Sequence, residues 1–240
     1  MAAPIVKVTD LHKAYRRGAA PTPVLCGLDL EIGRGECVFL VGPSGSGKST
    51  LLSILGCILT PDRGRVEILG ENLGQLSERR RAAFRRDRIG FVFQRFHLIR
   101  GLNALENVCV PLTLRGVAAK AAESLGRRRL TQVGLAAKAD CHPANLSTGQ
   151  CQRVALARAL AGEPELVLAD EPTASLDAEN GREVVRLLRD MTSRENKAAL
   201  VVTHDQRIFE FADRILVLDG GRVRRAPADA AGPEKGAAPC

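Results

Sequence analysis

The sequence predicts an α/β fold with a mainly parallel central sheet, and three observations lead to this prediction. Continuous apolar runs, rather than alternating ones, occur at Cys37 to Val41, Leu166 to Ala169 and Leu200 to Thr203. Such runs are typical of strands that are covered on both faces. The stretch between the last two runs has apolar residues at helical spacing. The length of 240 residues is enough for one substantial core with a smaller inserted subdomain.

The first part of the chain predicts short strands of an antiparallel edge. Apolar residues alternate in places over 5–8 and 25–32, and the Gly/Ala/Pro stretch Gly18 to Pro23 predicts a loop between them. Further along, Pro61 to Gly64 has the composition of a turn, and Arg65 to Leu69 that of another short strand.

The middle and the end of the chain predict helices inserted between strands. Ile89 to Phe93 reads as a strand, and the Ala-, Leu- and Arg-rich block at about 95–162 predicts an inserted helical subdomain. Strands resume with the runs at 166 and 200, helical spacing occupies Ala178 to Met191, and a strand at Ile215 to Leu218 precedes a hairpin turn. We expect one domain over 1–226 and a disordered tail over 227–240.

Charge is in excess but is not focused on one segment. Lys and Arg number 35 against 27 Asp and Glu, a formal charge of +8. Arginines gather at 79–88 and at 127–129, and this pattern fits either a solvated helical face or an anionic partner such as lipid headgroups. The distribution does not predict a nucleic-acid partner.

The cysteines point to a reducing compartment. There are seven, with no CxxC pair and no histidine at metal-ligand spacing, which argues against a zinc site or a disulfide scaffold. The N-terminal residues lack the pattern of a signal peptide, and the longest uncharged stretch, Ser49 to Pro61, is shorter than the ~20 residues that span a bilayer. We therefore expect a cytoplasmic protein, with any membrane-spanning part on a separate polypeptide.

A glycine-rich segment between an apolar strand and a predicted helix matches the phosphate-binding P-loop pattern at every fixed position. Its residues are Gly42, Pro43, Ser44, Gly45, Ser46, Gly47, Lys48, Ser49 and Thr50. Glycines let backbone N–H groups turn toward an anion, and the following helix adds its positive dipole end. We expect bound ATP, with Lys48 reaching the β- and γ-phosphates and the Ser49 hydroxyl ligating Mg²⁺.

Two adjacent acids end the apolar strand at 166–169. A buried strand that ends in carboxylates delivers them to the edge of the sheet where ligands gather. Asp170 then supports Mg²⁺, and Glu171 orients or deprotonates the attacking water. Alternatively, because Pro172 follows, the pair caps a helix and supplies its first-turn acid.

A second anion-seeking helix start lies at Ser147, Thr148, Gly149 and Gln150, which open an Ala/Leu-rich stretch. This segment resembles the LSGGQ signature of the ATP-binding-cassette (ABC) ATPases, and the resemblance covers the chain from Ile5 to about Val223. It implies a P-loop NTPase (RecA-like) core with the antiparallel edge and helical subdomain described above. It also implies a head-to-tail dimer, in which each signature contacts the γ-phosphate held by the other subunit's P-loop.

The resemblance assigns further roles residue by residue. It implies that Tyr15 stacks on adenine, that Gln94 contacts Mg²⁺ and water, that Asp177 belongs to the D-loop, and that His204 is the switch histidine. Gln94 and His204 each follow an apolar strand, so they are expected at the same edge as Asp170. Thr148 departs from the family's glycine, and this leaves the tightness of the closed dimer open.

The stretch after Gln94, from Arg95 to Gly116, is similar to the branch of ABC ATPases for macrolide export (MacB), lipoprotein release (LolD) and glycolipid export (DevA). This resemblance implies an ATPase subunit on the inner face of the cell membrane, with Glu171, His204 and Lys48 as the residues that catalyse ATP hydrolysis. It also implies a second copy, a permease and a periplasmic adaptor as partners. A membrane-bound regulatory scaffold of the cell-division type stays open; a GTPase lacks support because no Asn-Lys-x-Asp segment occurs.

Overall fold

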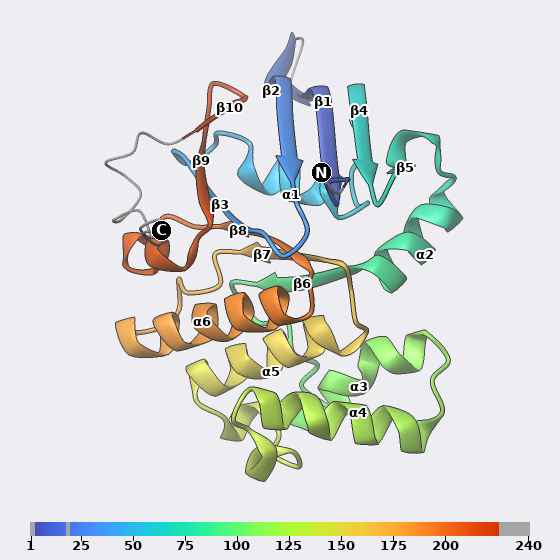
Figure 1. Ribbon diagram of the computed structural model, residues 1–240, viewed down its shortest axis with the longest axis vertical. Helices are drawn as coiled ribbons and strands as arrows, with labels where there is room; N and C mark the ends of the chain where they lie inside the picture. Colours follow the sequence, from blue (N-terminus) through green and yellow to red (C-terminus); the bar gives the residue numbers. More distant parts are fainter. Residues whose placement is uncertain (1–2, 18–19, 226–240) are drawn as a thin grey trace, which may run out of the picture.

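The computed structural model describes residues 3–17 and 20–225, and it places two sheets above a layer of helices (Figure 1). The tail expected to be disordered at 227–240 lies outside the described residues. Among the described helices, none combines the length and the apolarity needed to cross a membrane.

The larger sheet has six strands in the order β10-β9-β3-β8-β7-β6. Five of them run parallel, and β10 pairs antiparallel with β9 through the predicted hairpin turn. Their bounds are β3 Cys37–Val41, β6 Ile89–Phe93, β7 Leu166–Asp170, β8 Ala198–Val202, β9 Arg214–Asp219 and β10 Arg222–Arg225. The mainly parallel sheet predicted from the apolar runs is confirmed.

The smaller sheet is antiparallel, with the order β2-β1-β4-β5. Its strands are β1 Val6–Arg17, β2 Ala20–Ile32, β4 Arg63–Ile68 and β5 Glu71–Asn72. The predicted antiparallel edge is therefore present, but its first two strands are much longer than expected. Register shifts in β1 between Val8 and Leu11 and between Lys13 and Ala14 break the alternation of side chains, which is why the sequence pattern shows only fragments of each strand.

Helix α1 (Lys48–Leu55) contributes to a core shared by the two sheets, which Phe84 of α2 also joins, and helices α3 to α6 cover the opposite face of the large sheet. Successive residues of β3 face the two cores in turn: Val38 packs with α1, and Phe39 packs with the helices below. This two-sided burial explains why the strands read as continuous apolar runs. The remaining helices are α2 Glu78–Arg88, α3 Ala104–Leu114, α4 Ala119–Gln132, α5 Thr148–Ala161 and α6 Ala178–Arg194.

Helices α3, α4 and α5 pack together below β6 and β7, where the sequence predicted an inserted helical block (Figure 1). Short 3₁₀ segments occur at Leu73–Gln75, Ala136–Lys138, Pro143–Asn145 and Gln206–Phe211. The fold thus brings the ends of β3, β6, β7 and β8 to one edge of the large sheet.

Candidate nucleotide-binding site

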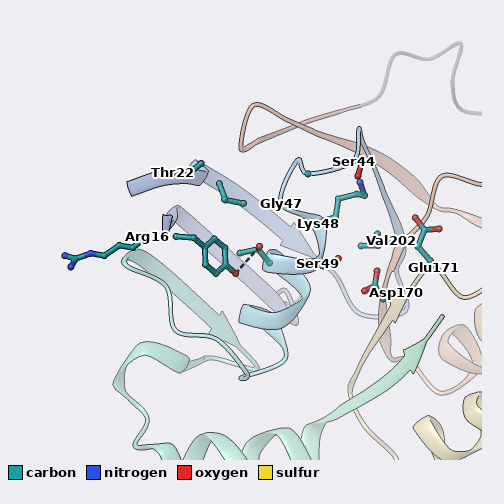
Figure 2. A pocket seen from close by; sticks show the side chains of 13 residues that line it. Arg16, Thr22, Ser44, Gly47, Lys48, Ser49, Asp170, Glu171 and Val202 are labelled. Atoms are coloured by element: carbon teal, nitrogen blue, oxygen red, sulfur yellow. Dashed lines mark hydrogen bonds between the residues drawn. The ribbon is translucent and has the colours of Figure 1, made fainter. Parts of the chain in front are cut away.

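A cavity of about 700 Å³ opens between the two sheets, beside the start of α1 (Figure 2). That volume lies within the usual range for a small-molecule site. Its lining comes from both sheets: Tyr15, Arg16, Thr22, Val24, Ser44, Gly45, Gly47, Lys48, Ser49, Thr50, Asp170, Glu171 and Val202. Residues that lie far apart in the sequence therefore share one cavity.

The glycine-rich loop needs glycine at two of its positions. Gly47 precedes α1 with a φ of 105°, and a Cβ there would lie 2.9 Å from the side chains of Val24 and Leu25. Gly42 has a φ of 151°, and its Cβ would collide with the carbonyl oxygen of Leu218. No side chain caps the start of α1, so its first N–H groups and its dipole are directed at whatever occupies the loop.

Lys48, the first residue of α1, folds back over the loop. Its Nζ donates to the carbonyl oxygens of Gly42 and Pro43, at 2.8 and 2.9 Å. The ammonium is thereby held against the cavity wall on the side of the sheet edge (Figure 2). A point charge in this position, next to unpaired helix N–H groups, suits a polyphosphate.

Asp170 ends β7 and faces the cavity near Ser49 (Figure 2). Burial, together with the adjacent charge of Glu171, raises the pKa of Asp170 above its ordinary value, and Ser49 and Lys48 partly offset this rise. A carboxylate in these surroundings is energetically strained at neutral pH unless a cation approaches it.

Glu171 is held in an unusual backbone conformation at the same edge. Its φ is +47°, in the left-handed region that costs energy for residues other than glycine, and its N–H donates to the carbonyl of Val202. Its Oε1 lies 2.9 Å from Nδ1 of His204, whereas its buried Oε2 has no hydrogen-bond partner among the described residues. One carboxylate oxygen is therefore oriented by a histidine, and the other is free to accept a hydrogen bond.

The far end of the cavity is formed by β1 and β2. Tyr15, which is 37 % exposed, places its hydroxyl 3.3 Å from Thr50 Oγ1. Arg16, Thr22 and Val24 line the same end, and sequence reasoning missed all three. Thr22 pairs with Tyr15 across the two strands, so only the strand register could have revealed it.

Gln94 and Asp177 lie outside this cavity lining. Gln94 is exposed and directly follows Phe93, which pairs in register with Asp170. It is therefore at the same sheet edge as the acids, as predicted. Asp177 caps α6: its Oδ1 accepts from the backbone of Asn180 at 2.9 Å, and its Oδ2 from the Asn180 amide at 2.7 Å.

The four residues from Ser147 to Gln150 also lie outside the cavity, at the start of α5. Ser147 Oγ accepts from the Gln150 N–H at 3.2 Å, and Gln150 Oε1 accepts from the Ser147 N–H at 3.0 Å, which forms a capping box. Ser147 and Thr148 are exposed, while Gly149 is buried against Asn180, whose Oδ1 would be 2.5 Å from an added Cβ. The start of α5 therefore contributes no residue to the lining of the chain's own P-loop cavity.

The oxygen ligands at the sheet edge fit a hard divalent cation. The Ser49 hydroxyl and the desolvated Asp170 carboxylate lie together at this edge. No group of three His, Cys, Asp or Glu side chains that could hold a metal occurs within residues 3–17 and 20–225. A hydroxyl and a carboxylate suit Mg²⁺, which takes few protein ligands and completes its shell with phosphate oxygens and water. Over the same residues, six cysteines are free thiols.

Comparison with known proteins finds similarity over more than nine-tenths of the chain. The family model described as ABC transporter matches residues 25–174. The chain is 45 % identical over 219 residues to the lipoprotein-releasing system ATP-binding protein LolD of Legionella pneumophila (strain Lens), covering 91 % of this chain and 96 % of that protein. It is 46 % identical to LolD of Anaeromyxobacter dehalogenans (strain 2CP-C), covering 93 % and 94 %.

Two further relatives are a longer protein, of which only part is matched, and a cassette of known structure. The macrolide export ATP-binding/permease protein MacB 1 of Aeromonas hydrophila subsp. hydrophila is 41 % identical over 95 % of this chain, but the match spans only 36 % of that protein. A solved structure, the dimeric post-hydrolysis state of the ATP-binding cassette MJ0796 bound to ADP and Pi, is 40 % identical with a TM-score of 0.84. That match covers 92 % of this chain and 97 % of the solved one.

Proposed function

Because the chain belongs to the ABC transporter family and is an ATP-hydrolysing cassette of the LolD and MacB kind, we propose that two copies close head to tail around two ATP and drive a separately encoded permease. The observation that carries this proposal is the separation of two anion-seeking helix starts. Lys48 lies in the cavity of its own chain, and Ser147 lies outside it. A second copy can bring its Ser147 to this cavity, as the dimeric state of the related cassette suggests.

We assign the chemistry as follows. The P-loop N–H groups, the α1 dipole and Lys48 hold the β- and γ-phosphates, and Ser49, Asp170 and Gln94 would hold Mg²⁺. When bound, Mg²⁺ neutralises charge on the phosphate oxygens. Glu171 accepts a proton from the attacking water through its unpartnered Oε2, and His204 holds the other oxygen of that carboxylate in place.

The partner's signature completes the site in this proposal. Ser147, Gly149 and the first N–H groups of the partner's α5 meet the γ-phosphate, and Asp177 with its D-loop lies next to that helix through Asn180. Thr148 occupies the first turn of α5 with an exposed side chain, so its extra bulk is accommodated without strain in the single chain. Tyr15 offers its ring to the adenine from the far end of the cavity.

An apolar groove offers a place for the permease. Its volume is about 320 Å³, and it lies between β6 and α3. Phe93 and His97, which flank Gln94, line it together with Ile99 and Leu114, which are 46 % and 64 % exposed. An apolar cytoplasmic segment of the permease that binds here would touch the loop that carries Gln94.

The printed names of the relatives support a permease partner. LolD is named as an ATP-binding protein of a lipoprotein-releasing system, and the match spans 96 % of it; the name of MacB joins ATP-binding and permease parts, and the match spans 36 % of that protein. We therefore infer a cytoplasmic position on the inner face of the membrane, export or extraction as the direction, and, for a MacB-like system, a periplasmic adaptor.

Affinity isolation of the tagged chain from detergent-solubilised membranes tests the partner. We expect a permease to co-purify with the wild-type chain and to be lost with Leu114→Glu, which charges the groove. Ile58→Glu serves as the matched control, because Ile58 is equally exposed, at 56 %, and does not line the groove. Recovery of a division-site membrane protein in place of a permease would favour a regulatory scaffold instead, and equal recovery with both variants would exclude the groove.

A further inference from the structure

Arg158 lies on α5, eleven residues after the signature serine, and it donates two short hydrogen bonds to a neighbouring loop. Its Nη2 donates to the carbonyl oxygen of Phe96 and its Nη1 to that of His97, each at 2.6 Å. No carboxylate of the described residues forms an ion pair with this guanidinium, and burial lowers the pKa of Arg158. Two backbone carbonyls are therefore its main partners.

The two residues that accept from Arg158 are both in the left-handed backbone region. Phe96 has a φ of 56° and His97 a φ of 47°, and neither is a glycine. Their turn also includes a hydrogen bond from the Phe96 N–H to the Phe93 carbonyl at 3.2 Å, and the His97 ring packs on that of Phe93 with centroids 4.7 Å apart. Consecutive residues in this region persist only where the surroundings hold them, and the planar guanidinium fork provides such a hold.

Gln94 lies between the end of β6 and this turn. Phe93, the last residue of β6, precedes it, and Phe96, whose carbonyl accepts from Arg158, follows two residues later. A second side chain of α5, the buried Gln152, donates to the carbonyls of Phe93 and Pro172, at 3.4 and 2.8 Å. Helix α5 lies against β6 (Figure 1), so one rigid helix contacts the loops after both β6 and β7.

The other end of the same helix is the signature. Along α5, Ser147 and Arg158 are separated by about 16 Å at a rise of 1.5 Å per residue. A displacement of the signature end when it meets ATP on another subunit would be carried to Arg158, because the helix moves as one body.

We propose that Arg158 is a positioning residue for ATP hydrolysis: its two hydrogen bonds fix the turn that places Gln94 and tie that turn to the signature helix. The inference rests on the proposed role of Gln94 near Mg²⁺ and the attacking water. Without the fork, the Phe96 and His97 carbonyls lose their donor, the turn relaxes, and Gln94 leaves its place while the nucleotide-binding loop stays intact.

A double-mutant cycle with Gln94 tests this role. In steady-state ATPase assays with Mg²⁺, we expect Arg158→Met to lower kcat roughly tenfold while KM changes by less than about twofold. In a Gln94→Ala background, the same substitution should change kcat by less than about twofold, because its effect acts through Gln94. Arg158→Lys, which can reach one carbonyl but lacks the fork, should recover part of kcat. If Arg158→Met fails to fold, the cycle is run with Arg158→Lys.

Arg153 is the matched control on the same helix. It is also half-buried, but it donates to the Val133 carbonyl and to Glu183 and does not contact the loop after β6. Arg153→Met should lower Tm, and its effect on kcat should be the same with and without Gln94→Ala. Multiplicative effects of Arg158→Met and Gln94→Ala on kcat would overturn the proposal. A wild-type kcat for Gln94→Ala would overturn both it and the role of Gln94, leaving the ATPase assignment standing.

Discussion

Asp170 and Glu171 are neighbours at the end of β7, yet their surroundings prepare them for different tasks. Asp170 is desolvated beside another carboxylate, which raises its pKa, whereas Glu171 is oriented by His204 in a strained backbone. The strand pattern predicted that both acids reach the sheet edge. The left-handed φ of Glu171 has no sequence signal, because it depends on how β7, β8 and the following loop meet.

Substituting Asp170→Asn should stabilise the protein while it removes hydrolysis. A carboxyl with a raised pKa costs stability while it is ionised at neutral pH, and that cost disappears as the pH falls and the group becomes protonated. We expect the variant to melt about 2–4 °C above wild type at pH 7. The gap should narrow as the pH falls through the raised pKa toward the ordinary value of 3.8, as measured by thermal unfolding without nucleotide. A lower Tm at pH 7 would show that Asp170 is a stabilising group.

Substituting Glu171→Gln should separate binding from chemistry. The amide keeps the shape and the hydrogen bond to His204 but does not accept a proton, so kcat should fall about a hundredfold or more. ATP affinity, measured by equilibrium titration, should stay within about threefold of wild type because the P-loop is unchanged. Turnover at the wild-type rate would remove Glu171 from the role of base.

At the scale of elements, an ion pair joins α4 to the end of α6. Arg129 of α4, almost fully buried, binds both carboxylate oxygens of Glu195, which follows α6, and also Gln132 at 3.0 Å. Burial acts to raise the pKa of Glu195, but Arg129 and, to a smaller extent, Lys197 outweigh it, and the pKa lies below its ordinary value. The pair therefore stabilises the folded state at neutral pH.

Substituting Arg129→Met should destabilise the protein by about 1–3 kcal/mol, because half-buried Glu195 then keeps only Lys197, 3.3 Å away, as a charged partner. Adding Glu195→Gln should recover part of that loss, as measured by urea unfolding at pH 7. A carboxyl with a lowered pKa contributes stability that is lost as the pH falls below its ordinary value of 4.5 and through the lowered value. The difference between wild type and Arg129→Met should accordingly shrink in acid; a loss that does not depend on pH would point to packing alone.

The elements also show how far sequence reasoning reaches. Strands buried on both faces and the loop of Gly42 to Thr50 follow from local patterns, and these were predicted. The length of β1 and β2 was not, because bulges interrupt their alternation. Arg16, Thr22 and the Arg158 fork belong to no local pattern, since each depends on a contact between segments that are distant in the chain.

At the scale of the whole molecule, the central claim is that each catalytic site is shared between two copies. The P-loop cavity and the start of α5 lie apart in one chain, and the related cassette was solved as a dimer. Two inactive variants can therefore complement each other. Lys48→Ala disables the P-loop only, and Ser147→Asp keeps the helix cap while placing a negative charge against the phosphate.

The control for this experiment uses two defects that fall on the same side of the site. In a mixed dimer of Lys48→Ala and Glu171→Gln, one site lacks the P-loop lysine and the other lacks the base. Neither site is intact, so this mixture should stay inactive.

The most direct measurement is the ATPase activity of an equimolar mixture of Lys48→Ala and Ser147→Asp, compared with each variant alone. Half of the randomly mixed dimers hold both variants, and each of these has one intact site, so activity should return to roughly a quarter of wild type. A mixture as inactive as its components, although affinity capture through a tag on one variant recovers the other, would contradict a site completed by the second copy.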